Sequence, residues 1–314
     1  MQAWLKMSVD TRRFPPNLTI PYRYLVPIRG NPQRASLFLV HSVAGELTWL
    51  QLLAQKLSPE LALYGFAAPG LNADAPFFFR LENMAAAYLH ELRQAQPEGP
   101  YRLGGYSLGG VIAFEMAQQL QREGELVDLL IMIDAFAPQP ERTADIASWS
   151  RNGLLMQVVA NQLALQWQAE TLLPADALGK LPFSEHSAFA ARHLLAHSQT
   201  PHAFRPLQSY LRRCQTMMRV HTQLLADYQA QALPQPVQTL LYRNTRGLIA
   251  RQSALQLPQL PETQRDPPHD WAPLLGQAPV TVDVDEEHFM FGREPVMAVI
   301  AQSLNEYLGA RALP

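Results

Sequence analysis

The first half of the chain alternates short, continuous apolar runs with longer segments in which apolar positions recur every three or four residues. Short apolar runs between turn formers are typical of buried strands, and the longer spacing is typical of amphipathic helices. The pattern predicts strands at residues 22–28, 36–41, 61–66, 101–106 and 127–134, and helices at 47–57, 83–96 and 110–122. Strands that alternate with helices indicate a mostly parallel sheet flanked by helices, which is an α/β fold.

The alternation stops after Asp134. Residues 138–235 have helical spacing, are rich in Leu, Ala, Gln and His, and contain no convincing strand. Strand character returns at 237–242 and 280–284, and a last amphipathic helix is predicted at 295–308. The second half therefore predicts a helical insertion followed by the rest of the sheet.

A chain of 314 residues that is 48% hydrophobic can bury one full-sized core. We therefore expect a single α/β core formed by residues 22–137 and 236–314, interrupted by a helical insertion at 138–235. Prolines cluster near the end of the N-terminal segment, so residues 1–21 are predicted to be linker-like.

Composition narrows the function classes. The formal net charge of −2 gives no electrostatic attraction to a polyanion such as nucleic acid. No stretch comes near the roughly 18 consecutive apolar residues of a membrane span, and the N-terminus lacks the apolar core of a signal peptide. The single cysteine, Cys214, excludes an intramolecular disulfide and suits a reducing compartment. We therefore expect a cytoplasmic protein with neither a nucleic-acid nor a membrane partner.

One serine lies between a predicted strand and a strong predicted helix, within Gly105-Tyr106-Ser107-Leu108-Gly109. A serine flanked by glycines in a strand-turn-helix setting is typical of a nucleophile elbow, whose sharp turn presents the hydroxyl above the sheet. The pattern alone is weak evidence, and its context is what carries the prediction. We predict that Ser107 is the nucleophile of a serine enzyme with the α/β-hydrolase fold.

A serine hydroxyl needs a general base, which is almost always a histidine oriented by a carboxylate. Of the nine histidines, only His288 follows the last predicted strand and precedes the terminal helix, as this fold requires of its base. We predict that His288 is the base and that His41 braces a loop. The others are expected on helix faces or loops: His90, His186, His193, His197, His202, His221 and His269.

The acid has two possible places, each at the end of a predicted strand. The strand LLIMI ends in Asp134, and a lone acid closing an apolar strand needs a partner. The later strand at 237–242 is followed by Arg243-Asn244, without a carboxylate. We therefore predict Asp134 as the acid. The acidic run at 285–287, directly before the predicted base, is the alternative source.

The tetrahedral oxyanion of such a reaction needs two hydrogen-bond donors. One is expected to be the backbone N–H of Leu108, directly after the nucleophile, and the other should come from a loop after an early strand. That loop is HSVAGE, and we place the second donor at Val43, with Ala44 as the alternative. His41 and Ser42 are expected to brace the shape of this loop.

Five segments together resemble a known family: FLVHSVAG, YGFAAPGL, GPYRLGGYSLGGVIAFEMAQQL, LLIMIDAFAP and EEHFMF. They are similar to the thioesterase domains that end polyketide and nonribosomal peptide synthases. The resemblance implies that Ser107 takes an acyl chain from the phosphopantetheine thioester of an acyl or peptidyl carrier protein. It also implies a triad completed by Asp134 and His288, an oxyanion hole formed by Val43 and Leu108, a lid formed by the insertion, and no bound cofactor.

The long insertion and the position of the acid favour the terminating type of this family over the discrete editing type. The editing type tends to keep its acid after the later strand, where this chain has Arg243-Asn244. The implied product is an acid or a macrocycle. Three alternatives stay open, namely a discrete editing thioesterase, a carboxylesterase and a catalytically inactive carrier-docking module.

Overall fold

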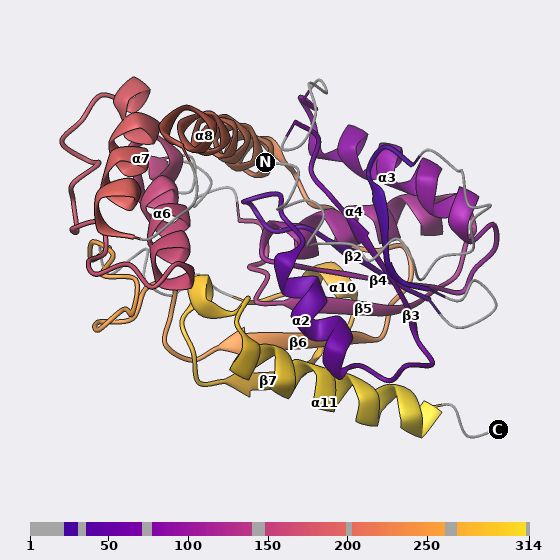
Figure 1. Ribbon diagram of the computed structural model, residues 1–314. Coiled ribbons are helices and arrows are strands. Elements are labelled where there is room, and N and C mark those ends of the chain that lie inside the picture. The colour runs from indigo at the N-terminus through magenta and orange to yellow at the C-terminus, as the bar shows by residue number, and fades with distance from the viewer. Residues whose placement is uncertain are drawn as a thin grey trace.

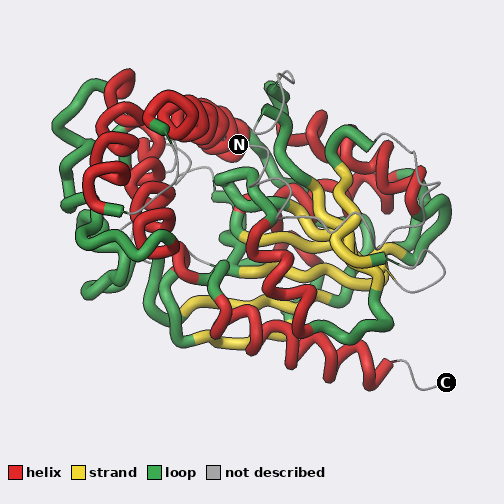
Figure 2. Tube along the Cα trace, in the orientation of Figure 1, coloured by secondary structure: helices red, strands yellow, loops and turns green. Residues whose placement is uncertain are grey.

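The computed structural model describes residues 22–30, 36–70, 77–139, 148–198, 203–260 and 269–311, so the segment predicted as a linker lies outside the described residues. The centre of the protein is a β-sheet (Figure 2). It has seven strands in the order β1-β3-β2-β4-β5-β6-β7. Its strands are β1 (Leu25–Arg29), β2 (Ser36–Val40), β3 (Ala62–Phe66), β4 (Tyr101–Tyr106), β5 (Val127–Ile133), β6 (Thr239–Asn244) and β7 (Val280–Val284).

All neighbouring strands pair in parallel except β1, which pairs antiparallel with β3. The sequence explains which strands are central. The run VDLLIMI in β5 is buried along almost its whole length, as a strand covered on both faces must be. The edge strand β1 contains Pro27, which lacks the N–H that a central strand needs.

Two layers of helices cover the sheet (Figure 1). Helices α3 (Leu81–Ala95) and α4 (Leu108–Arg122) share a hydrophobic cluster with Leu130 and Met132 of β5. Helices α2 (Thr48–Lys56) and α11 (Glu294–Arg311) share another with Leu129 and Ile131. Alternate residues of a strand point to opposite faces, so the two helix pairs lie on opposite sides of the sheet. The fold is therefore the predicted α/β-hydrolase fold.

The helices between β5 and β6 gather beside the sheet, at one end of the molecule (Figure 1). They are α6 (Leu154–Gln166), the short 3-10 helix η3 (Phe183–Glu185), α7 (His186–His197) and α8 (Phe204–Asp227). Their apolar side chains form a third cluster, which includes the buried Cys214. The described part of residues 138–235 contains no strand. None of the described helices has the length and apolar character needed to cross a membrane.

Two boundaries differ from the predicted ones in ways that matter for the site. Helix α4 begins at Leu108, directly after the predicted nucleophile, and not at residue 110. Strand β6 continues to Asn244, two residues beyond its predicted end, because its pairing with β7 extends through polar residues. The end of β6 is thus set by its pairing with β7 and not by where its apolar run ends. The last two short helices are α10 (Ala272–Leu275) and the 3-10 helix η4 (His288–Met290).

Candidate active site

The predicted site residues all follow the carboxyl ends of parallel strands. Ser107 follows β4, Asp134 follows β5, His288 lies just beyond β7, and the loop with Val43 follows β2. Because the carboxyl ends of parallel strands meet at the same edge of a sheet, residues far apart in sequence converge there. The sheet topology thus builds the site.

The turn at Ser107 has the geometry of a nucleophile elbow. Ser107 has a φ of 57°, a left-handed conformation that is rare for residues other than glycine. Its backbone N–H donates to the carbonyl of Ile133 at 2.8 Å, which ties the turn to the neighbouring strand. A Cβ atom on Gly109 would lie 2.4 Å from the backbone oxygens of Val40 and His41, so only glycine fits there. The flanking glycine therefore lets α4 approach β2 closely.

Three side chains form a hydrogen-bonded series. The Oγ atom of Ser107 lies 2.9 Å from Nε2 of His288, and Nδ1 of His288 lies 2.7 Å from Oδ2 of Asp134. An ionised carboxylate can only accept, so Nδ1–H of His288 donates to Asp134. This tautomer leaves Nε2 unprotonated and able to accept the Ser107 hydroxyl proton. The arrangement can activate a serine for attack on a carbonyl carbon.

Asp134 is fully buried and surrounded by donors. Its Oδ1 atom accepts from the backbone N–H of Asn244 at 2.9 Å and from Nε2 of His269 at 3.0 Å. Burial alone would raise the pKa of the Asp134 carboxyl, but the hydrogen bonds from His269 and His288 outweigh it. The pKa therefore stays well below its usual range, and Asp134 is an anion at neutral pH.

The acidic run before His288 is engaged elsewhere. Asp285 forms a salt bridge with Arg246. Glu287 is buried and accepts a hydrogen bond from the hydroxyl of Ser253 at 2.8 Å. In the described part of the chain, Asp134 is the residue whose carboxylate accepts a hydrogen bond from the His288 imidazole. The geometry thus favours the acid at the end of β5 over the alternative.

The loop after β2 is held by a pair of buried histidines. Nδ1 of His41 donates to the carbonyl of Ser42 at 2.7 Å, and Nδ1 of His221, on α8, donates to the carbonyl of Val43 at 2.9 Å. The two imidazole rings are stacked, with centroids 5.0 Å apart. Burial lowers the pKa of His221 to about 4, and burial together with the neighbouring His221 lowers that of His41 to about 3. Both rings are therefore neutral at neutral pH.

These contacts orient the peptide unit that ends in the Val43 N–H. The Ser42 carbonyl accepts from His41 and also from the backbone N–H of Gly45 at 2.9 Å. In a trans peptide the N–H points away from the C=O, so fixing the Ser42 carbonyl fixes the direction of the Val43 N–H. The N–H of Ala44 is directed at the Ser42 hydroxyl, 3.3 Å away. The Ala44 N–H thus has an acceptor within the loop, and Val43 stays the predicted donor.

The insertion also contacts the site directly. A Cβ atom on Gly45 would lie 2.4 Å from the sulfur of Met217, so α8 packs against the loop after β2. The side-chain amide of Gln162, on α6, donates to the carbonyl of Phe289 at 2.8 Å, and Phe289 is the residue directly after the predicted base. The insertion is thus fastened to two of the segments that carry the predicted site.

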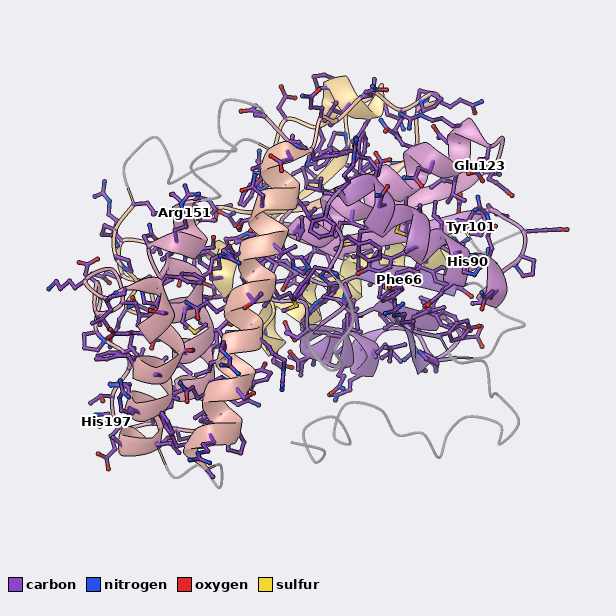
Figure 3. The ribbon with its side chains drawn as sticks, turned by 90° about the horizontal axis from the view of Figure 1, so that it is seen from above. Phe66, His90, Tyr101, Glu123, Arg151 and His197 are labelled. Atoms are coloured by element: carbon purple, nitrogen blue, oxygen red, sulfur yellow. The ribbon has the colours of Figure 1, made fainter. Side chains whose placement is uncertain are left out.

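Two histidines that the sequence places outside the site belong to it. His221 lies on a helix face and His269 lies in a loop, as expected, but their side chains bond to Val43 and Asp134. No local motif marks either residue, because both reach the site through the tertiary fold. In contrast, His90 and His197 lie at opposite ends of the molecule (Figure 3). Within the described ranges, no group of three or more His, Cys, Asp or Glu side chains could hold a metal ion.

Comparison with known proteins identifies the family of this chain. The non-reducing polyketide synthase Preu8 of Preussia isomera is 38% identical over 136 residues, which are 43% of this chain and 6% of that protein. The dimodular nonribosomal peptide synthase of Bacillus subtilis (strain 168) is 41% identical over 113 residues, or 36% of this chain and 5% of that protein. The chain thus corresponds to a small share of these relatives.

Solved structures share the fold. A four-domain nonribosomal peptide synthetase bound to AMP and glycine superposes with a TM-score of 0.69 at 23% identity, covering 93% of this chain and 20% of that one. The NocB thioesterase domain, in covalent complex with a fluorophosphonate nocardicin G analog, superposes with a TM-score of 0.58 at 22% identity. That match covers 91% of this chain and 99% of the NocB domain. The family model for the thioesterase domain matches residues 35–300, most of the length of this chain. The chain therefore belongs to the thioesterase domain family.

Proposed function

We propose that this protein releases an acyl, peptidyl or polyketide chain from the phosphopantetheine thioester of a carrier protein, through an acyl-enzyme on Ser107. The observation that carries the proposal is the hydrogen-bonded series from Ser107 through His288 to Asp134, in a member of the thioesterase domain family. The carrier protein is the partner that delivers the phosphopantetheine arm, and the arm is part of the substrate.

In the first half of the reaction, Nε2 of His288 takes the hydroxyl proton of Ser107 as Oγ attacks the thioester carbonyl. The backbone N–H groups of Val43 and Leu108 donate to the oxyanion that develops. Leu108 is the first residue of α4, so its N–H has no acceptor within the helix and is free for this role. Asp134 stabilises the imidazolium of His288, which then protonates the departing pantetheine sulfur.

In the second half, His288 activates a nucleophile that attacks the acyl-enzyme and frees Ser107. If the nucleophile is water, the product is an acid; if it is a hydroxyl or amine of the acyl chain, the product is a macrocycle. We assign the insertion the role of a lid, and its contacts with the loop after β2 and with the segment that carries His288 support this role. The terminating type of thioesterase is supported by Asp134, since the end of β6 carries Asn244 instead of an acid.

Substrate preference tests this proposal against the alternative of an esterase. The same acyl chain is presented as a pantetheine thioester, as a thioester on a holo carrier protein and as a simple oxygen ester, and kcat/KM is measured for each. We expect the thioesters to be preferred, with the carrier-bound one best. A clear preference for the oxygen ester would make the protein a carboxylesterase, and no turnover of any of the three would support an inactive docking module.

A further inference from the structure

His269 is a second histidine on the carboxylate of Asp134. Its side chain is 5% exposed, and its Nε2 atom lies 3.0 Å from Oδ1, whereas His288 bonds to the other oxygen, Oδ2. Because Asp134 is an anion that can only accept, Nε2 of His269 must carry the proton of this hydrogen bond. The two carboxylate oxygens thus each accept from one imidazole.

The segment that carries His269 is anchored beside the end of β5. Trp271, two residues further on, is 1% exposed and donates from its indole N–H to the carbonyl of Ala135 at 2.8 Å. The ring of Phe136 contacts both imidazoles, with centroids 4.7 Å from His269 and 4.8 Å from His288. Phe136 therefore packs against both imidazoles, and the hydrogen bond from Trp271 to Ala135 anchors the segment that carries His269. This packing fixes the direction of the His269 ring.

We propose that His269 is a positioning residue that holds Oδ1 of Asp134 and thereby aims Oδ2 at His288; this inference rests on the proposed function. The carboxylate can turn about its Cβ–Cγ bond, and the hydrogen bond from His269 resists that turn together with those from Asn244. A hydrogen bond from His269 also helps to keep Asp134 ionised although the carboxylate is fully buried. His269 does not need to touch the substrate for this role.

The variant pair His269→Leu and His269→Gln tests the role of the donated proton. Leucine removes the donor, whereas the glutamine amide can still donate to Oδ1. Losing a hydrogen bond to a charged group predicts a fall in kcat of roughly ten- to a hundredfold for the leucine variant, with little change in KM. The glutamine variant should recover most of kcat. His90→Leu, on the exposed face of α3, is the matched control and should match the wild type.

Equal kcat in both variants and the wild type would overturn the proposal, and so would equally low kcat in leucine and glutamine variants that remain folded. A failure of the proposed function gives a different result, namely a wild-type protein that does not turn over acyl-pantetheine thioesters at all. If the wild type acts through Ser107 and His269→Leu is equally active, only the role proposed for His269 is wrong.

A measurement on the unmodified protein covers the case in which the leucine variant does not fold. The 15N chemical shifts of labelled histidine distinguish a protonated ring nitrogen from an unprotonated one. We expect Nε2 of His269 to carry a proton at neutral pH, and Nδ1 of His288 to carry one as well. A His269 ring protonated on Nδ1 alone could not donate to Asp134 and would overturn the proposal.

Discussion

Asn244 donates from its side-chain amide to both carboxylate oxygens of Asp134, at 3.0 Å to Oδ1 and 2.9 Å to Oδ2. The two residues end neighbouring parallel strands, β5 and β6, and are the two places at which the sequence allows an acid. The two side chains therefore lie in contact. Asp134 supplies the carboxylate, and Asn244 supplies hydrogen-bond donors that hold it.

Asn244→Asp should impair the enzyme through like-charge repulsion. It would put a second carboxylate about 3 Å from Asp134, and two carboxylates that close cannot both be ionised. The pair would keep a proton to higher pH, so the acid limb of the kcat/KM profile should move to higher pH. Asn244→Ala, which removes donors without adding charge, is the control. An unshifted acid limb in Asn244→Asp would contradict this account.

Asp134→Asn should cripple turnover while the fold persists. The amide keeps the shape of the side chain but has no charge to stabilise the His288 imidazolium and can favour the wrong tautomer of that ring. We expect kcat to fall on the order of a thousandfold or more. Circular dichroism should show the same fold. Near-normal activity would move the acid to the run at 285–287, where Asp285→Asn provides the comparison.

His221→Leu should lower kcat through the loop that carries Val43. The leucine cannot donate to the Val43 carbonyl, so the loop loses this hydrogen bond to α8 and keeps the packing of Met217 against Gly45. Losing one oxyanion donor outright costs roughly a hundred- to a thousandfold in kcat, and the expected loss lies below that range because the Val43 N–H itself remains. His221→Asn, whose amide can take the place of Nδ1, should retain more activity. A leucine variant with the kcat of the wild type would exclude this link between the insertion and the site.

The buried histidine pair should make the fold acid-sensitive. In the folded protein the pKa of His221 is about 4 and that of His41 about 3, whereas a histidine in the unfolded chain has a pKa of about 6.5. Below about pH 6.5 these two histidines are protonated in the unfolded chain but stay neutral in the folded protein. The free energy of unfolding should therefore fall as pH decreases towards about 4. Each ring contributes up to about 1.4 kcal/mol per pH unit.

Urea unfolding at several pH values measures this slope. The variant His221→Asn removes one titrating ring and should flatten the fall in the free energy of unfolding, whereas His90→Asn, on the exposed face of α3, should leave it unchanged. A stability that does not change between about pH 6.5 and about pH 5 in the wild type would contradict the low pKa values of the pair.

The apolar pattern predicted the α/β fold, because strands buried on both faces leave continuous apolar runs such as LLIMI, and the motif around Ser107 then indicated the α/β-hydrolase type. Local sequence also singled out Ser107, His288 and Asp134, which lie in contact as a series. It missed His221 and His269, because a histidine on a helix or in a loop shows no sign of its partner across the fold. The extension of β6 to Asn244 was missed too, since that pairing depends on its neighbours.

The acyl-enzyme tests the central proposal most directly. The protein is incubated with an acyl-pantetheine thioester, quenched with acid and analysed by intact mass and peptide mapping. We predict that the wild type gains the mass of the acyl group on the peptide that contains Ser107, and that a Ser107→Ala variant with the circular dichroism spectrum of the wild type gains none. No adduct at Ser107 in the wild type, or an adduct that persists in Ser107→Ala, would contradict the account.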